Sequence, residues 1–256
     1  MIELLRGDCT EVLPRLPQAS VQAIITSPPY FGLRDYGIPP THWPEIVYSP
    51  LAGLPPITVP PSVCCLGLEE SPTAYIAHLV HVFRLLHPLL RDDGVVWLNL
   101  GDSYAQPSKW GGRSGNKHRP HDENRYPRRR VRCEAGIKDK DLFGNPWRAA
   151  LALQADGWYL RADVIWDKSN GMCESVEDRP TRSHEYLFLL AKSPRYYYDA
   201  DAIREPLKPK TLTTYGTKHR GHGNDATGNV KADNWGRALS TRHRPAARRK
   251  PCVPGA

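Results

Sequence analysis

The sequence predicts an α/β fold in which short apolar strands alternate with amphipathic helices around a largely parallel sheet. Hydrophobic residues make up 40% of the 256 residues, which is enough for one sizeable core. Strand-like apolar runs alternate along the chain with segments of helical periodicity. The 25 prolines indicate long connections between these elements.

In the first third of the chain, a short helix capped by Thr10 is expected before a buried strand at Val21–Ile25. This strand should stop at the two prolines that follow it, because proline cannot continue a sheet ladder. Residues 38–72 are rich in proline and are expected to form a long loop or insertion. A helix should begin at Thr73, with three histidines on its surface or at its end, namely His78, His81 and His87.

The rest of the chain divides into a structured part and a basic tail. Residues 1–205 are expected to form one domain, with residues 105–141 as an Arg-rich insertion, and residues 206–256 to form a disordered tail. The expected elements are a turn at Asp92–Gly94, a strand at Val95–Leu100, a helix at Trp147–Asp156 and strands at Trp158–Trp166 and Tyr186–Ala191.

Charge is distributed unevenly along the chain. The net charge is +8, but residues 204–256 carry 12 Lys/Arg against 3 Asp/Glu, and residues 108–148 carry 12 against 5. The remaining residues are acidic, with 11 Lys/Arg against 19 Asp/Glu. Two basic blocks beside an acidic remainder favour contact with nucleic-acid phosphates over a uniformly solvated surface.

The cysteine pattern and the apolar runs exclude several classes of protein. The six cysteines contain no CxxC pair, and no Cys/His spacing matches a zinc site, so no metal is expected. No apolar run approaches the roughly 20 residues needed to cross a bilayer, and the N-terminus has no signal-peptide pattern. A reduced, cytoplasmic protein without a membrane partner is therefore expected.

The tetrapeptide Ser27-Pro28-Pro29-Tyr30 carries the candidate chemistry. Ligands of open α/β sheets bind beyond the carboxyl ends of the strands, where this turn should lie. The Ser27 hydroxyl and the proline carbonyls can accept hydrogen bonds from an exocyclic amine, and Tyr30 can stack on a flipped base. A plain strand-ending turn is the competing interpretation, because the chain contains other Pro-Pro pairs.

The surroundings of this tetrapeptide resemble a known family. The segment RGDCTEVLPRLPQASVQAIITSPPYFGLRDYG is similar to the opening of DNA amino-methyltransferases whose catalytic motif precedes their cofactor motif. Later segments, LLRDDGVVWLNLGDSY and LRADVIWDKSNGMCESVEDRPTRSHEYLFLLAKSPRYYYD, also look like this family. The resemblance covers roughly residues 1–205 and implies a Rossmann-like, S-adenosylmethionine-dependent methyltransferase fold.

By this resemblance, Ser27, Pro28, Pro29 and Tyr30 are the catalytic residues, and S-adenosylmethionine is the cofactor. Asp8 and Ser27 are expected to contact the cofactor, with helix capping as an equal alternative for Asp8. The later motifs place five residues near the target base or in structural roles, namely Trp166, Lys168, Asn170, His184 and Glu185.

The resemblance also implies double-stranded DNA as substrate and a possible partner restriction endonuclease. The Arg-rich segment 108–148, including Arg128, Arg129 and Arg130, is expected to contact phosphates or read the base sequence, with a solvated loop as the alternative. Serine at position 27 favours cytosine N4 over adenine N6. A cytosine C5 mechanism would need a cysteine nucleophile, and the Pro251-Cys252 pair lies in the expected tail. Other targets left open are RNA and protein amines.

One feature of the family is missing from the sequence. The chain has no segment resembling D-P-F-x-G-x-G-T, the glycine-rich turn that approaches the cofactor's amino-acid part. The methyltransferase fold is therefore expected to be incomplete at its C-terminus, with weak or no cofactor binding. An inactive fragment that only binds nucleic acid is the resulting alternative to an active enzyme.

Overall fold

This computed structural model describes residues 2–105, 136–169, 174 and 176–204. The chain divides into two units, residues 1–198 and 199–256, and the fold below is that of the first unit. Within its described residues the elements are α1 (Cys9–Val12), η1 (Leu13–Arg15), β1 (Val21–Thr26), β2 (Thr41–Trp43), β3 (Ile46–Tyr48), β4 (Ile57–Val59), β5 (Ser62–Cys64), α2 (Pro72–Leu86), η2 (His87–Leu89), β6 (Leu90–Leu100), α3 (Asn145–Ala155), β7 (Tyr159–Asp167) and β8 (His184–Ala191).

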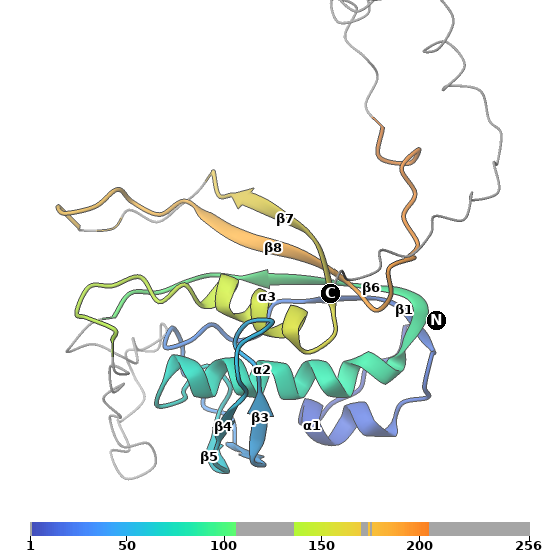
Figure 1. Cartoon of the computed structure of the whole chain (residues 1–256), viewed down its shortest axis with the longest axis horizontal. Coiled ribbons are helices and arrows are strands. Elements are labelled where there is room, and N and C mark those ends of the chain that lie inside the picture. The colour runs from blue at the N-terminus through green and yellow to red at the C-terminus, as the bar shows by residue number, and fades with distance from the viewer. Residues whose placement is uncertain (1, 106–135, 170–173, 175, 205–256) are drawn as a thin grey trace, which may run out of the picture. The chain divides into compact units, whose positions relative to one another are not determined.

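The central sheet has four strands in the order β1-β6-β8-β7 (Figure 1). β1 runs parallel to β6, whereas β8 is antiparallel to both of its neighbours. The expected α/β class is confirmed, but the expectation of a largely parallel sheet is wrong. Parallel neighbours need a long crossover, usually a helix, and the described residues between β7 and β8 form none.

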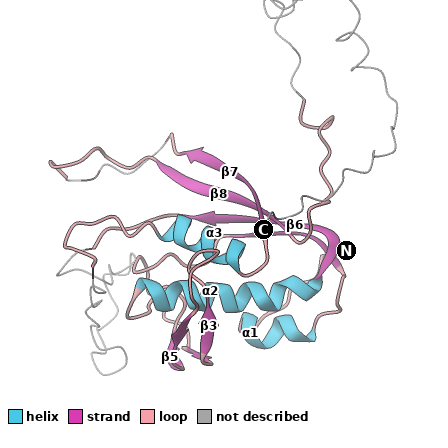
Figure 2. Cartoon of the chain, in the orientation of Figure 1, coloured by secondary structure: helices cyan, strands magenta, loops and turns pink. Residues whose placement is uncertain are grey.

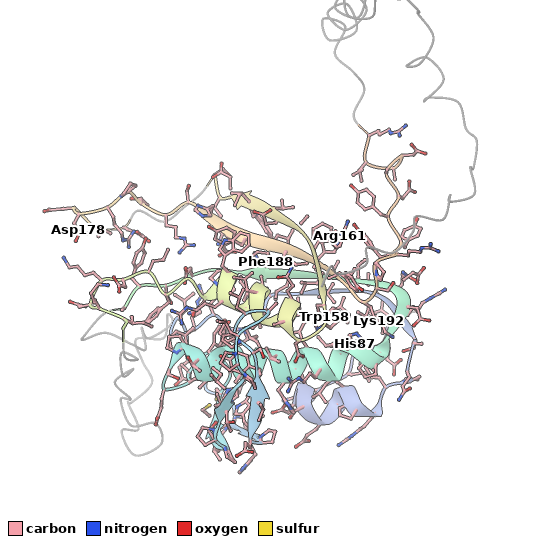
Figure 3. The ribbon with its side chains drawn as sticks, viewed as in Figure 1. His87, Trp158, Arg161, Asp178, Phe188 and Lys192 are labelled. Carbon is pink, nitrogen blue, oxygen red and sulfur yellow. The ribbon has the colours of Figure 1, made fainter. Side chains whose placement is uncertain are left out.

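Helices α2 and α3 lie on one side of the sheet (Figure 2). The core between these layers includes Val96 and Leu98 of β6, which are fully buried. Phe188 of β8 meets Trp147 of α3 at 5.2 Å between ring centroids, and His87 meets Trp158 at 5.0 Å (Figure 3). The first contact attaches α3 to the sheet, and the second joins η2, directly after α2, to the residue that precedes β7.

The opposite face of the sheet carries only a small apolar cluster among the described residues, formed by Val95, Leu189 and Ala191. Because successive strand residues point to opposite faces, Ile24 packs on the core whereas Ile25 is 80% exposed. The expectation that Val21–Ile25 is a buried strand is therefore wrong. β1 is an edge strand that is covered on one face.

The insertion at residues 38–72 is more regular than expected. It contains two antiparallel ribbons, β2 with β5 and β3 with β4, in place of an irregular loop. Burial alternates along β3, where Ile46 and Tyr48 are buried and Val47 is exposed. The apolar residues between the prolines thus pack on α2, which is why short strands form there.

The helix expected from Thr73 begins one residue earlier, at Pro72, and the Ser71 hydroxyl caps it by accepting from the Ala74 amide at 3.1 Å. His78 is fully buried, so its expected surface position is wrong. The insertion covers the helix face that would otherwise be exposed, and Trp43 stacks on the His78 ring at 4.1 Å.

Two local expectations also differ from the structure. Asp8, and not Thr10, caps α1, because its carboxylate accepts from the Thr10 amide at 2.8 Å. The turn expected at Asp92–Gly94 lies inside β6, where the register with β1 shifts as in a β-bulge.

No helix in the described part of the chain is long and apolar enough to span a bilayer.

Leu98→Ala should lower the free energy of unfolding by about 3 kcal/mol, because it leaves a cavity under α2 and α3. Ile25→Ala is a control in the same sheet and should cost less than about 1 kcal/mol, because this side chain is already in solvent. Urea unfolding followed by circular dichroism measures both. Equal losses would contradict a sheet that is covered on one face only.

Candidate active site

The turn formed by Ser27, Pro28, Pro29 and Tyr30 follows directly after β1, at the carboxyl end of that strand. The parallel register places Thr26 opposite Leu98, so the next residues on the two strands, Ser27 and Asn99, are neighbours. The Ser27 hydroxyl lies 3.1 Å from Asn99 Oδ1. The sheet register therefore positions the candidate hydroxyl.

The Tyr30 hydroxyl is the centre of a polar cluster. It lies 2.7 Å from Asn99 Oδ1, 2.9 Å from Glu185 Oε2 and 3.3 Å from the Ser27 hydroxyl. Burial and the adjacent Glu185 carboxylate raise the pKa of Tyr30 to about 12, so the phenol stays protonated and can donate. Its single hydrogen can go to only one of the two acceptors at a time.

The lack of a side chain at Gly101 makes room for the Tyr30 ring. A Cβ added at Gly101 would lie 2.6 Å from Tyr30 Cε2. Any side chain at this position would therefore displace the ring. Glycine at the end of β6 is what allows Tyr30 to lie against the backbone of that strand.

Glu185 on β8 connects this cluster to β7. Its Oε1 forms an ion pair with the Lys168 ammonium, while its Oε2 accepts from Tyr30. Burial acts to raise the pKa of Glu185, but the hydrogen bonds from Lys168 and Tyr30 outweigh it and hold the pKa below its ordinary value. Glu185 is therefore an anion at neutral pH.

The two proline carbonyls are in different environments, contrary to the expectation that both are available. Tyr75 of α2 donates its hydroxyl to the Pro29 carbonyl at 3.0 Å. Among the described residues, the Pro28 carbonyl accepts no hydrogen bond. Gly67, with φ of +89°, packs against the same turn, and its carbonyl accepts from the Gly32 amide at 2.7 Å. The turn is thus supported by the hydrogen bond from Tyr75 of α2 and by the packing of Gly67 of the insertion.

Asp8 is placed in a structural role at the start of α1. One carboxylate oxygen accepts from Thr10, and the other accepts from the Thr41 hydroxyl at 2.5 Å. Burial acts to raise the pKa of Asp8, but these hydrogen bonds hold it below the ordinary value. The capping alternative is therefore realised, and contact between Asp8 and a cofactor stays a prediction.

The remaining candidates divide into three groups. Lys168 and Glu185 come together with Tyr30, and Trp166 is paired with Glu185 across β7 and β8, with 54% of its surface exposed. His184 packs on Tyr186 at 5.3 Å between ring centroids, on the face of β8 opposite Glu185. Asn170, Arg128, Arg129 and Arg130 lie outside the described residues.

Three residues of this site were missed by the sequence analysis, namely Asn99, Gly101 and Tyr75. Asn99 had a detectable signal, because it is the single polar residue in the apolar run Val95–Leu100 and lies next to the strand end. Tyr75 had none, since it reads as one more apolar residue of an amphipathic helix.

Tyr30→Phe keeps the ring but removes the hydroxyl shared by Asn99 and Glu185. In the wild type, the lowered pKa of Glu185 contributes stability above its ordinary value of 4.5, and this contribution is lost as the pH falls toward the folded-state pKa. The variant lacks one of the two donors, so its stability deficit should shrink as the pH falls from about 7 to below about 4. Urea unfolding across this range measures the deficit.

Tyr36→Phe is the matched control, because Tyr36 is 58% exposed and lies in the segment after the same turn. It should leave both stability and its pH dependence nearly unchanged. A Tyr30→Phe deficit that stays constant with pH would show that the Tyr30–Glu185 hydrogen bond does not stabilise the ionised carboxylate.

Comparison with known proteins identifies the family of the chain. The family model described as DNA methylase matches residues 21–248. The chain is 46% identical over 206 residues to the Type II methyltransferase M.Cfr9I of Citrobacter freundii, covering 79% of this chain and 58% of that protein. It is 42% identical over 204 residues to the Type II methyltransferase M.SmaI of Serratia marcescens, covering 80% and 60%.

Among solved structures, the PvuII DNA methyltransferase (cytosine-N4-specific) aligns with a TM-score of 0.45 and 15% identity, over 78% of this chain and 53% of that one. The chain spans less than two thirds of the length of the curated relatives it matches. The family model, by contrast, matches most of the chain. The chain belongs to the DNA methylase family.

Proposed function

We propose that this chain carries the amine-binding part of an S-adenosylmethionine-dependent DNA methyltransferase that methylates an exocyclic amine of a flipped base. The observation that carries the proposal is the pair of acceptors after β1, the Ser27 hydroxyl and the Pro28 carbonyl, which accepts no hydrogen bond from the described residues. Membership of the DNA methylase family supports DNA as the substrate. A partner restriction endonuclease stays a prediction from the family resemblance.

An exocyclic amine needs this arrangement because its lone pair is delocalised into the base and is a poor nucleophile. Two acceptors that bind its two N–H groups favour a more tetrahedral nitrogen and direct the lone pair out of the ring plane. The Ser27 hydroxyl is positioned by its hydrogen bond to Asn99. The Pro29 carbonyl already accepts a hydrogen bond from the Tyr75 hydroxyl and is therefore less available to the amine. The Pro28 carbonyl is thereby left as the second acceptor, and orientation supplies most of the rate enhancement.

Charge develops on the attacking nitrogen as the new N–C bond forms. Glu185 is an anion close to Ser27 through the Tyr30 hydroxyl, so it can stabilise this positive charge. The nitrogen then loses one proton, and Ser27 and Tyr30 form a hydrogen-bonded path from the amine toward the Glu185 carboxylate. No covalent bond between protein and base is needed.

The bound cofactor would supply an electrophilic methyl group on a sulfonium. The described residues fit the amine end of the reaction, whereas Asp8, the expected cofactor contact, has both carboxylate oxygens engaged by Thr10 and Thr41. The cofactor-binding residues, Asp8 and Ser27, therefore stay a prediction.

Cytosine N4 is the target that we favour, because position 27 is serine and not aspartate. Adenine N6 is the second candidate. A chain that binds nucleic acid without transferring methyl groups is the alternative from another class.

Ser27→Ala should lower methyl transfer to duplex DNA at least about a hundredfold, because it removes one of the two acceptors that orient the amine. DNA binding should be unchanged, since the side chain carries no charge. Incorporation of labelled methyl groups and a filter-binding titration measure the two properties.

Ser20→Ala is the matched control, because Ser20 is exposed just before β1 and its hydroxyl bonds only to the Pro17 carbonyl among the described residues. It should retain wild-type transfer. DNA binding without any transfer by the wild-type chain would identify the nucleic-acid-binding alternative, and transfer to RNA or protein in place of DNA would reject the proposed substrate.

A further inference from the structure

The insertion and α2 enclose a second cluster of reactive side chains, away from the Ser27–Tyr30 turn. Cys64 ends β5, Glu69 lies in the following loop, and His78 lies on α2. All three are buried, and one ligand atom from each lies within 4.8 Å of the other two. Burying a carboxylate and an imidazole together is costly unless a proton or a cation compensates their lone pairs.

The outer atoms of this cluster are already held by neighbours. Ser62 Oγ lies 3.3 Å from His78 Nε2, and the Gly67 amide donates to Glu69 Oε2 at 2.9 Å. The atoms that face one another are His78 Nδ1 and Glu69 Oε1, at 2.9 Å. In metal sites, too, the second atom of a histidine or carboxylate ligand is oriented by a hydrogen bond, as it is for His78 and Glu69.

We propose that Cys64, Glu69 and His78 bind a single zinc ion that attaches the insertion to α2. Sulfur, imidazole nitrogen and carboxylate oxygen are the three donor types that zinc accepts, at about 2.3 Å for sulfur and about 2.0–2.2 Å for nitrogen and oxygen. The three donor atoms lie within 4.8 Å of one another, so small side-chain rotations bring them to the spacing of about 3.3–3.8 Å that a tetrahedral ion with these bond lengths needs. A water molecule would supply the fourth ligand.

Binding would release protons, because zinc requires the Cys64 thiolate and a neutral His78 ring with an unprotonated Nδ1. The Cys64 proton and the proton shared by His78 and Glu69 would leave to solvent. The ion would replace the His78–Glu69 hydrogen bond, while the contacts of these two residues with Ser62 and Gly67 would remain.

Zinc binding would also affect the Ser27–Tyr30 turn, because Gly67 contacts both the turn and Glu69. A Cβ added at Gly67 would lie 2.9 Å from the Tyr30 carbonyl oxygen and 3.2 Å from Pro29 Cβ, so this residue packs directly on the turn. Fixing Glu69 fixes the Gly67 amide two residues away. Zinc would therefore stiffen the support of the turn without taking part in the reaction.

The test is the metal content of the full chain, purified from zinc-supplied medium and measured by mass spectrometry. We expect about one zinc per chain. After replacement by cobalt(II), the absorption spectrum should show a thiolate-to-cobalt charge-transfer band. Cys64→Ser should lose both the zinc and this band.

Cys65→Ser is the control, because the adjacent Cys65 thiol is directed to the Ile38 carbonyl at 3.4 Å. It should keep the zinc and the charge-transfer band. A wild-type chain without zinc that gives no such band on cobalt addition overturns the proposal, even if Cys64→Ser fails to fold. Equal zinc content in Cys64→Ser and the wild type also overturns it. None of these measurements depends on methyl transfer.

Discussion

The parallel pairing of β1 with β6 is the constraint on which the candidate active site depends. Ser27 and Asn99 are 72 positions apart in the chain, and only the register that sets Thr26 opposite Leu98 makes them neighbours. A slip of one residue would turn every side chain of β1 to the other face of the sheet. The same slip would bury Ile25 and expose Ile24, so core packing and site geometry specify one register.

The turn after β1 is rigid because its support comes from elements outside the sheet. Tyr75 holds the Pro29 carbonyl from α2, and Gly67 of the insertion closes on the other side. Glu185 and Lys168 join the Tyr30 hydroxyl to the two strands at the far edge of the sheet. The helix α2, the insertion and strand β8 thus all contact the turn formed by Ser27, Pro28, Pro29 and Tyr30. Such support suits a reaction whose rate depends on how the amine is oriented.

Local patterns predicted the parts of this structure that depend on neighbouring residues. The Ser27–Tyr30 turn, the helix after Ser71 and the strand that contains Asn99 all follow from apolar periodicity and proline chemistry. The antiparallel course of β8 and the exposed face of β1 did not, because they depend on which strands pair. His78 is buried because the insertion covers α2. The helical periodicity of apolar residues in α2 does not predict this cover.

The central claim is that the Ser27 hydroxyl and the Pro28 carbonyl orient an exocyclic amine of DNA for methylation. It is tested most directly by incubating duplex DNA with the full chain and saturating S-adenosylmethionine, and then identifying the nucleosides by mass spectrometry. The expected product is N4-methylcytosine, which disappears with Ser27→Ala. Methylation at cytosine C5, or no methylated base from the wild-type chain, would contradict it.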